Sequence, residues 1–499
     1  MNEATGTDGG LLLAAAVLLP FAGMLFGMLA GGRHTQRIAF VVIPLGLAVA
    51  VGIAMKWLDG SGPVVYLLGG WAPPLGIALR ADGPAVAMLL TVAAVVGGVG
   101  VFARAEFDSP MAGESRAAYS YWLLLLAVWG SLNLVLVSGD LFTLYVALEL
   151  MTFAAVPLVC LSGSGETLRA ALRYLLFALC GSVLYLLGAV LVFGAYGTLD
   201  IALLARAVRP EALSWTVLAL MTAGLLAKTA LFPLHIWLPP AHAGAPAPAS
   251  ALLSGLVIKG SWFLAVRLWF DAMPAVATWP SAQLLGALGA AAILFGNAVA
   301  LRQARLKLLV AYSTVAQIGY LFLMFPLAFD AAAARIVDGL ALAGGIMQAI
   351  SHATAKSAMF MAAGSIYSAL GHDRIADFAG LAKALPVTVF AFGLGGISLV
   401  GLPPAGGFLA KWWLLSAAAA SGQWWWAAVL LVGGLLTAAY LFAVVSRALT
   451  APSAPLAVAP VARYRELATL ALALASVLLG LVALIDVRGL PGSSSPVGA

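Results

Sequence analysis

Runs of about twenty predominantly apolar residues recur along the whole 499-residue sequence, and they constrain its fold more than any other feature. The hydrocarbon core of a bilayer is about 30 Å thick, and a helix of about 20 apolar residues spans it. Scanning for such runs predicts an all-α integral membrane protein with fourteen spanning helices. The predicted helices cover residues 10–30, 38–57, 84–104, 117–138, 140–161, 169–194, 212–234, 247–270, 281–301, 307–327, 336–367, 387–415, 424–446 and 464–486.

The composition excludes a soluble protein. Apolar residues make up 63% of the chain and charged residues only 9%, whereas soluble domains carry about 25% charged residues. In a membrane protein the positions of the basic residues influence how the chain is oriented, so the net charge of +6 does not indicate nucleic-acid binding. We expect a lipid bilayer and no nucleic acid as a partner. Most connections between the predicted helices are short, so we predict one polytopic domain over residues 1–499.

The basic residues outside the predicted spans are distributed unevenly between the two sides of the membrane. If the N-terminus lies outside, the inner loops hold about twice as many Lys and Arg residues as the outer loops, which is the bias that the positive-inside rule describes. An even number of spans then places both termini on the outer side of a multi-pass membrane protein.

Four lysines fall inside predicted spans, each on a different helix: Lys228, Lys259, Lys356 and Lys411. A charged side chain at the bilayer centre costs about 2.5–3.5 kcal/mol on insertion scales, so such residues usually mark ion paths. For any single lysine, a side chain that reaches from a helix end to the interface is the alternative. We interpret the set of four as an ion path.

Prolines interrupt two of these helices, one in each half of the chain. Pro233 follows Lys228 by five residues, and Pro403 and Pro404 shortly precede Lys411. Irregular backbone at membrane depth is tolerated only where protein or water satisfies the freed groups, and the freed carbonyls can solvate an ammonium group. Paired interruptions are typical of inverted-repeat transporters. The predicted repeats cover residues of about 117–270 and 281–446.

Titratable residues accompany the lysines near the first break. Glu149 is the only carboxylate deep in the first half of the predicted bundle, and a buried carboxylate requires a cation or a proton. Lys228 is its natural partner, and a static ion pair is the alternative to a role in transport. His235 and His242 border the break. Histidine suits proton relay, while helix capping is the alternative for both.

A polar stripe runs along the predicted helix 336–367. Gln348, His352 and Lys356 are each four residues apart and therefore share one helix face. Together with Lys259, this stripe predicts a water-lined proton wire. A hydrogen-bonded seam between helices is the alternative.

No motif indicates a bound cofactor or a catalytic site. The sequence has no His, Cys, Asp and Glu set with metal-ligand spacing, and no nucleotide-binding loop, haem-attachment motif or nucleophile elbow is visible. We therefore expect no metal, no cofactor and no catalytic residue, and the sequence leaves open whether the chain belongs to an enzyme complex.

Several long motifs occur in a characteristic order: GDLFTLYVALELM, AKTALFPLHIWLPPAHAGAPAPASALLSG, KLLVAYSTVAQIGY, SHATAKSAMFMAAG and GLPPAGGFLAKW. On these motifs the chain resembles, over roughly residues 65–445, the antiporter-like proton-channel subunits of respiratory complex I, membrane-bound hydrogenases and the Mrp multisubunit cation/proton antiporters. The resemblance implies fourteen helices, two inverted five-helix repeats, discontinuous helices 7 and 12, and a polar axis along the membrane centre.

The resemblance also implies roles for individual residues. Glu149 is similar to the fifth-helix glutamate of that family, Lys228 to its seventh-helix lysine and Lys259 to its eighth-helix relay residue. Lys411 is similar to the twelfth-helix lysine, and His352 falls in the eleventh-helix histidine motif. The stretch YLLGGWAPPLGIALRADGPAVAML resembles the corresponding part of the D-type member of Mrp antiporters. Relatives from complex I and from hydrogenases stay open.

We therefore expect a proton-translocating subunit of a bacterial-type inner membrane, assembled with other membrane subunits. Protons would enter from the cytoplasm near Lys228 and Lys259, pass His352 and Lys356, and leave through Lys411. The complex as a whole would exchange them for Na⁺ or K⁺, or would drive them by an NADH dehydrogenase or hydrogenase reaction. A stand-alone carrier of a small solute and a non-conducting scaffold are the alternatives from other classes.

Overall fold

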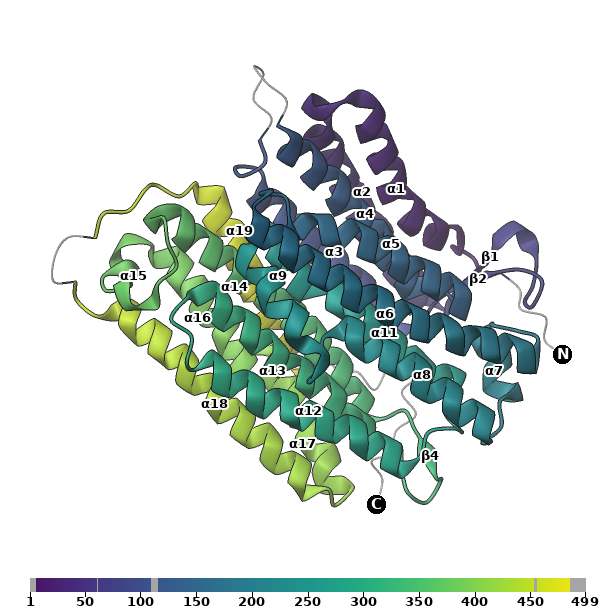
Figure 1. Ribbon diagram of the computed structural model, residues 1–499. Coiled ribbons are helices and arrows are strands. Elements are labelled where there is room, and N and C mark those ends of the chain that lie inside the picture. Colours follow the sequence, from purple (N-terminus) through teal and green to yellow (C-terminus); the bar gives the residue numbers. More distant parts are fainter. Residues whose placement is uncertain (1–5, 61, 109–114, 453–455, 485–499) are drawn as a thin grey trace.

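The computed structural model describes residues 6–60, 62–108, 115–452 and 456–484, which form a bundle of long, roughly aligned helices (Figure 1). Within these residues, twelve helices are long and apolar enough to cross a membrane. They are α1 (Leu11–Ala30), α2 (Gly32–Asp59), α3 (Gly83–Ala103), α4 (Arg116–Val137), α5 (Leu141–Val159), α6 (Gly165–Tyr196), the segments Ala212–Gly244 and Ala247–Ala272, α12 (Trp279–Ala300), α13 (Leu306–Leu327), α18 (Trp424–Leu449) and α19 (Arg463–Leu478).

Three further helices lie at the remaining predicted spans. α14 (Leu340–Leu370) is long enough to cross a membrane, but its polar residues lower its hydropathy. α16 (Pro386–Val400) and α17 (Gly406–Ala420) are two shorter pieces of the predicted span 387–415. The all-α membrane fold is confirmed, while the exact number of fourteen spans and the two inverted repeats stay predictions.

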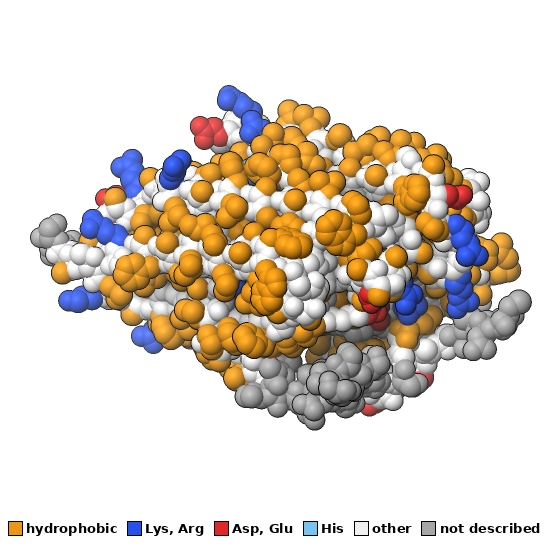
Figure 2. Space-filling view, turned by 90° about the horizontal axis from the view of Figure 1, so that it is seen from below, with side chains coloured by type: hydrophobic (Ala, Val, Ile, Leu, Met, Phe, Trp, Pro, Cys, Tyr) orange, Lys and Arg blue, Asp and Glu red, His pale blue; other side chains and the backbone are white. Residues whose placement is uncertain are grey.

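The surface of the bundle is suited to a bilayer. Figure 2 shows hydrophobic side chains over the middle of one face and most of the charged side chains toward its opposite edges. On α6, for example, Leu172, Leu176, Val183, Leu187 and Val190 are all exposed. A soluble monomer rarely exposes such a continuous apolar surface. The chain is therefore a multi-pass integral membrane protein.

Both predicted helix breaks are present. α8 (Ala212–Thr229) ends at Ala230, whose left-handed backbone (φ 59°) turns the chain out of the helix. Pro233 then precedes the short turn η2 (Leu234–Trp237) and α9 (Leu238–Gly244). In the second half, α16 ends at Gly401 (φ 87°), and Pro403 and Pro404 lie in the loop before α17. The spans at 212–234 and 387–415 are thus both discontinuous, as predicted.

The segment after the first break contains irregularities that the sequence did not reveal. It begins as α10 (Ala247–Leu252) and continues through α11 (Ile258–Val266), but it widens into π-helical turns at η3 (Leu253–Val257) and η4 (Arg267–Ala272). Such turns loosen the regular backbone ladder and often occur at functional sites. The predicted helix 247–270 therefore has the right extent but a less regular course.

Short elements close the ends of the bundle. The strands β1 (Val64–Leu67) and β2 (Ala78–Ala81) pair antiparallel around η1 (Leu68–Gly70), with Val64 opposite Ala81. A second small pair joins β3 (Phe329–Asp330) to β4 (Arg335–Ile336). The remaining short helices are α7 (Ile201–Ala207), η5 (Ile375–Asp377), α15 (Leu381–Ala384) and η6 (Leu479–Leu484).

Two glycines set the distance between α6 and α8. A Cβ atom on Gly181 would lie 2.5 Å from the Gly224 carbonyl oxygen, and a Cβ on Gly224 would overlap the Gly181 carbonyl oxygen. Small residues at such a crossing let the two backbones touch, and packing of this kind drives helix association in membranes. The contact places Ser182 and Lys228, which follow these glycines on their helices, on the same side of the bundle.

We predict that Gly224→Ala destabilises the protein, because the added methyl group forces α6 and α8 apart. Overpacking of this kind costs about 1–3 kcal/mol. Thermal unfolding in detergent measures the effect. Gly194→Ala is the matched control. Gly194 lies on α6, the other helix of this crossing, but no atom lies within 4 Å of the added Cβ, so this variant should be neutral or slightly stabilising. Equal stability of the two variants would contradict the proposed close crossing.

Candidate functional site

The predicted pair of Glu149 and Lys228 is present. Lys228 Nζ lies 3.0 Å from Glu149 Oε1 and 3.0 Å from Thr152 Oγ1, both on α5. Ser182 Oγ of α6 donates a hydrogen bond to the same carboxylate oxygen. The two charged side chains are only 4% and 15% exposed. Burial of this degree makes each partner dependent on the other, since an unpaired buried charge is costly.

Lys259 lies in the first turn of α11 and is fully buried. Its ammonium group donates to the Ser254 carbonyl across the π-helical turn η3. Ser254 Oγ in turn lies 2.9 Å from Thr314 Oγ1 of α13. No carboxylate lies within 4.0 Å of Lys259 in the described part of the chain. A backbone carbonyl is thus the observed partner of this ammonium group.

The predicted stripe on α14 faces α13. Lys356 is fully buried and donates to the Val310 carbonyl oxygen at 3.0 Å and to Ser313 Oγ. One turn earlier, both ring nitrogens of His352 are buried without a hydrogen-bond partner among the described residues. A further turn earlier, Gln348 Nε2 donates to Gln317 Oε1 at 2.9 Å. Only part of the stripe is therefore a hydrogen-bonded seam.

Lys411 is a residue of α17, and its side chain reaches the end of α16. Its ammonium group donates to the carbonyl oxygens of Leu399 at 2.8 Å and Val400 at 2.9 Å, and it lies 4.3 Å from the centre of the Tyr320 ring. At this second break, carbonyl groups freed by the end of a helix thus hold an ammonium group. We expected the same arrangement for Lys228 at the first break. At that first break Lys228 uses Glu149 and Thr152 instead.

The polar face of α13 joins these lysines, and our sequence reasoning missed it. Thr314 contacts Ser254 near Lys259, and Ser313 accepts from Lys356. Gln317 Nε2 donates to the Leu399 carbonyl oxygen at 3.4 Å, which also accepts from Lys411. These residues are spaced by one turn or less on α13, so their helical period was the available signal.

A contact between hydroxyl groups completes the axis in the first half. Thr229 Oγ1 on α8, next to Lys228, donates to Ser261 Oγ on α11 at 3.0 Å. Ser261 is two residues from Lys259. From Glu149 to Lys411, polar groups thus follow one another through the interior of the bundle, from α5 and α8 through α11, α13 and α14 to α17.

The two histidines at the first break are packed against aromatic rings. His235 is buried between Phe232 and Phe295, with ring centres 5.4 and 5.0 Å away, and its Nδ1 has no described partner. His242 is fully buried against Phe360 at 4.7 Å, and neither of its nitrogens has a partner among the described residues. For both histidines, the relay role stays a prediction.

Three further basic residues near helix ends are buried. Lys307, in the first turn of α13, donates to the Ala245 carbonyl oxygen at 2.5 Å. Arg465 on α19 lies over the Phe102 ring at 4.2 Å. Arg267, in η4, binds both carboxylate oxygens of Asp82 at 2.5 and 2.7 Å. Basic side chains at helix ends can thus turn into the bundle.

The Asp82–Arg267 pair fastens the segment that carries Lys259 to the start of α3. Asp82 also caps α3 by accepting from the Ala85 amide at 3.1 Å, and Asp271 binds the same guanidinium at 2.7 Å. Burial alone would raise the pKa of Asp82, but the charge and hydrogen bonds of Arg267 hold it below its usual value. The carboxylate therefore stays ionised at neutral pH and acts as a structural anchor.

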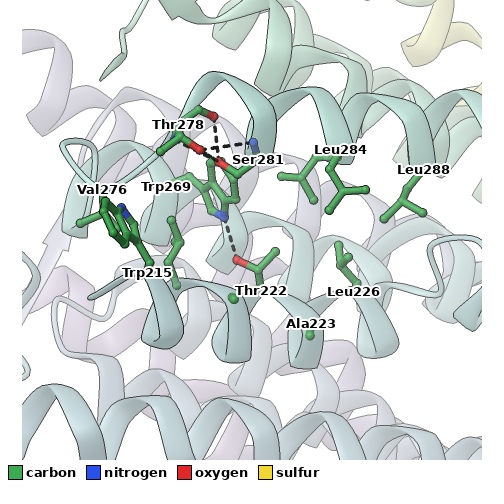
Figure 3. Close-up of a pocket in the computed structure, with 13 residues that line it drawn as sticks. Trp215, Thr222, Ala223, Leu226, Trp269, Val276, Thr278, Ser281, Leu284 and Leu288 are labelled. Carbon is green, nitrogen blue, oxygen red and sulfur yellow. Dashed lines mark hydrogen bonds between the residues drawn. The ribbon is translucent and has the colours of Figure 1, made fainter. Parts of the chain in front are cut away.

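A cavity of about 350 Å³ lies apart from this axis, between α8 and α12 (Figure 3). Its lining is mainly apolar and includes Trp215 and Leu284, while Trp269 donates to Thr222 Oγ1 at 2.8 Å inside it. None of the predicted site residues lines it. Among the described residues, no group of three His, Cys, Asp or Glu side chains is arranged to hold a metal ion.

An all-α membrane bundle with paired helix breaks and buried lysines along its centre defines a class of ion-translocating membrane subunits. A family model described as "NADH:quinone oxidoreductase/Mrp antiporter, TM" matches residues 138–437, a range that contains Glu149, Lys411 and every candidate residue between them. The chain belongs to this family.

Relatives come from more than one kind of complex. The chain is 37% identical over 415 residues to the N-type subunit of the NADH-quinone oxidoreductase of Desulforudis audaxviator, covering 82% of this chain and 80% of that protein. It is 31% identical over 411 residues to the D-type subunit of the Na(+)/H(+) antiporter of Alkalihalophilus pseudofirmus, covering 80% and 79%.

Solved structures share the whole fold. A chain of the Mrp complex from Dietzia sp. DQ12-45-1b aligns over 98% of both chains with a TM-score of 0.85, at 24% identity. A chain of the membrane-bound sulfane sulfur reductase, an archaeal respiratory membrane complex, aligns over 95% of both chains with a TM-score of 0.85, at 27% identity.

We predict strong coupling between Glu149 and Lys228 in stability. Lys228→Met leaves a buried carboxylate without its cation and should cost about 3–5 kcal/mol, while the double variant with Glu149→Gln should recover much of this loss. Thermal unfolding in detergent of the two single variants and the double variant measures the coupling energy. Additive effects of the two substitutions would show that the pair does not act as a unit.

Proposed function

We propose that this chain translocates protons along the buried axis from Glu149 to Lys411, as an antiporter-like subunit of a multisubunit membrane complex. The observation that carries the proposal is the set of three buried lysines, Lys259, Lys356 and Lys411, without a carboxylate within ion-pair distance in the described part of the chain. An ammonium group that is held only by carbonyl and hydroxyl oxygens can give up its proton, whereas a paired one is held in place.

The Glu149–Lys228 pair would act as the switch of this axis. While the carboxylate lies 3.0 Å from Lys228 Nζ, it stabilises the charge on that lysine. If the pair opens, the charge on Lys228 loses its partner in a poorly solvated interior, and a proton is driven toward Lys259. The contact between Thr229 and Ser261 lies in that direction.

Direction and membrane placement belong to the same proposal. Protons enter from the cytoplasm near Lys228 and Lys259, pass His352 and Lys356, and leave at Lys411. His235, His242 and Gln348 assist as relay or orienting groups. The chain lies in a bacterial-type inner membrane with both termini outside. Its two inverted repeats cover residues of about 117–270 and 281–446.

Among the possible complexes, we place an Mrp-type monovalent cation/proton antiporter first, with this chain as its D-type subunit. The proposal is supported by the stretch YLLGGWAPPLGIALRADGPAVAML, part of which forms the β1–β2 hairpin, and by the similarity to the D-type subunit of a Na(+)/H(+) antiporter. Other membrane subunits would then be its partners, and Na⁺ or K⁺ would be exchanged through the complex.

A redox-driven proton pump is the second candidate. The observation that favours it is the 37% identity to the N-type subunit of an NADH-quinone oxidoreductase. Purification of the intact complex from its native membrane, followed by identification of its subunits, separates the two. We predict small antiporter-type membrane subunits beside this chain. Recovery of an NADH dehydrogenase or hydrogenase module instead would move the chain to the second candidate.

We predict that Lys228→Ala, Glu149→Ala and Lys411→Ala each abolish proton transport by the assembled complex in membrane vesicles, because each removes a proton-binding or controlling group. A dye that reports the pH difference across the membrane measures this transport. Lys56→Ala is the control, because this lysine lies at the end of α2 in an exposed pair with Asp8.

Full coupling in both Lys228→Ala and Glu149→Ala would refute the proposed function. Transport by the chain alone, reconstituted without partners, would favour a stand-alone carrier. Normal activity of the complex after replacement of Lys228, Lys259, Lys356 and Lys411 together would favour a scaffold that conducts nothing.

A further inference from the structure

The cavity between α8 and α12 is continuous with the apolar surface that faces the bilayer (Figure 3). Two of its lining residues, Trp215 and Leu284, are 48% and 60% exposed. We propose that this cavity binds one acyl chain of an anionic glycerophospholipid, whose phosphate group contacts Arg209. This inference stands apart from the proposed function, since none of the residues on the buried axis lines the cavity.

The length of the cavity corresponds to one leaflet of a membrane. Its wall on α8 runs from Trp215 to Leu226. Its wall on α12 runs from Thr278 to Leu288, and both helices begin at the same end of the cavity (Figure 3). At 1.5 Å per residue, each wall is about 15–16 Å long. The hydrocarbon core of a bilayer is about 30 Å thick, so one leaflet contributes about 15 Å. An acyl chain parallel to the helices fills this length.

Two exposed tryptophans mark the end of the cavity at the membrane surface. Trp215 lies in the first turn of α8, and Trp279 is the first residue of α12 and is 46% exposed. Tryptophan is enriched where the hydrocarbon core meets the lipid headgroups. The polar lining residues Thr278 and Ser281 lie at this same end. The mouth of the cavity therefore lies at the level of the headgroups, and its far end lies near the middle of the membrane.

Small residues on α8 leave the room that the cavity occupies. Ala219 and Ala223 follow Trp215 at intervals of four residues, and both are exposed and line the cavity. Trp269 fixes the floor, because it is 2% exposed and donates to Thr222 Oγ1 at 2.8 Å. Empty space of this size is rare in packed proteins, since the atoms around it lose their contacts. A lipid chain supplies these contacts.

An exposed arginine lies beside the mouth. The Arg209 carbonyl oxygen accepts from Ser214 Oγ at 2.5 Å, which holds Arg209 against the first turn of α8 and close to Trp215. No carboxylate lies within 4.0 Å of its guanidinium group in the described part of the chain. The carboxylate of Glu211, two residues away, accepts from the Tyr196 hydroxyl at 2.7 Å. The guanidinium group is therefore available for a phosphate, which it can bind through two parallel hydrogen bonds.

The two parts of the lipid contribute differently to binding. An acyl chain gains little by moving from the bilayer into the cavity, because lipid tails are as apolar as the side chains that line it. The cavity therefore fixes the position of the chain, while the headgroup decides which lipid is preferred. One arginine near an anionic headgroup contributes about fivefold in affinity. We expect this preference for phosphatidylglycerol over phosphatidylcholine with the same acyl chains.

The test uses the intact complex in vesicles that contain a trace of phosphatidylglycerol with a photoactivatable group in the middle of one acyl chain. Illumination attaches this probe to the nearest residues, and mass spectrometry of the peptides locates them. We expect labelling of α8 between Trp215 and Leu226 and of α12 between Thr278 and Leu288. Unlabelled phosphatidylglycerol should suppress this labelling at about one fifth of the concentration that phosphatidylcholine requires.

Two substitutions fill the cavity from its exposed side. Ala219→Phe and Ala223→Phe should each remove most of the labelling, because the added ring takes the place of the acyl chain. Val190→Phe is the matched control, since it adds a ring to the exposed face of the neighbouring α6. It lies at a similar depth, because Gly188 on α6 packs against Met221 on α8, and it should leave the labelling unchanged.

A third substitution tests the headgroup. Arg209→Gln should keep the labelling but remove the preference for phosphatidylglycerol over phosphatidylcholine. As a change at an exposed position, it tests the inference even if the phenylalanine variants fail to assemble. Arg302→Gln is its control, because this exposed arginine follows the other end of α12, and it should keep the preference.

Three results would overturn the inference. Undiminished labelling in both Ala219→Phe and Ala223→Phe would show that the probe binds elsewhere. Even labelling of all exposed helices would show contact with bulk lipid only. Labelling of a partner subunit in place of α8 and α12 would show that protein covers the cavity. An unchanged preference in Arg209→Gln would refute the contact with the phosphate. Proton transport is not measured, so none of these results bears on the proposed function.

Discussion

The structure depends on how an apolar interior accommodates ammonium groups. Burying a charge without compensation is so costly that each lysine must find oxygen atoms at close range. Lys228 meets a carboxylate and a threonine hydroxyl, whereas Lys356 meets a carbonyl and a serine hydroxyl. The first arrangement pairs the ammonium group with a negative charge, and the second offers it only neutral oxygen atoms. In the function that we propose, this difference lets charge move along a row of similar residues.

The helix breaks supply part of those oxygen atoms. A regular helix uses most of its carbonyl groups internally, so a break or a widened turn makes them more available to a side chain. The end of α16 gives two carbonyl groups to Lys411, and the π-helical turn η3 gives one to Lys259. The prolines and glycines near these sites therefore have a chemical consequence as well as a geometric one. The irregular backbone provides the oxygen atoms that the buried ammonium groups need.

Much of the fold followed from local pattern, and the failures have a common cause. Hydropathy located the helices, the prolines marked both breaks, and the four-residue spacing on α14 marked a real polar face. The π-helical turns stayed hidden, because they depend on side-chain demands within the folded bundle. The partners of Arg267 and Lys307 also stayed hidden, because hydropathy alone does not say which way a helix-end side chain points. Ser313 and Tyr320 were missed because polar residues on an apolar helix have no evident partner until the neighbouring helix is known.

By itself, the sequence determined an all-α membrane protein with lysines at the depth of the bilayer, since segment length and hydropathy are local properties. It also identified the family, because several long motifs occur together. Only the tertiary structure decided that Lys228 has a carboxylate partner while Lys259 lies beside a carbonyl, and that α13 bridges the two halves. The reason is physical: protonation and transfer depend on distances of about 3 Å between different helices, and only packing sets those distances.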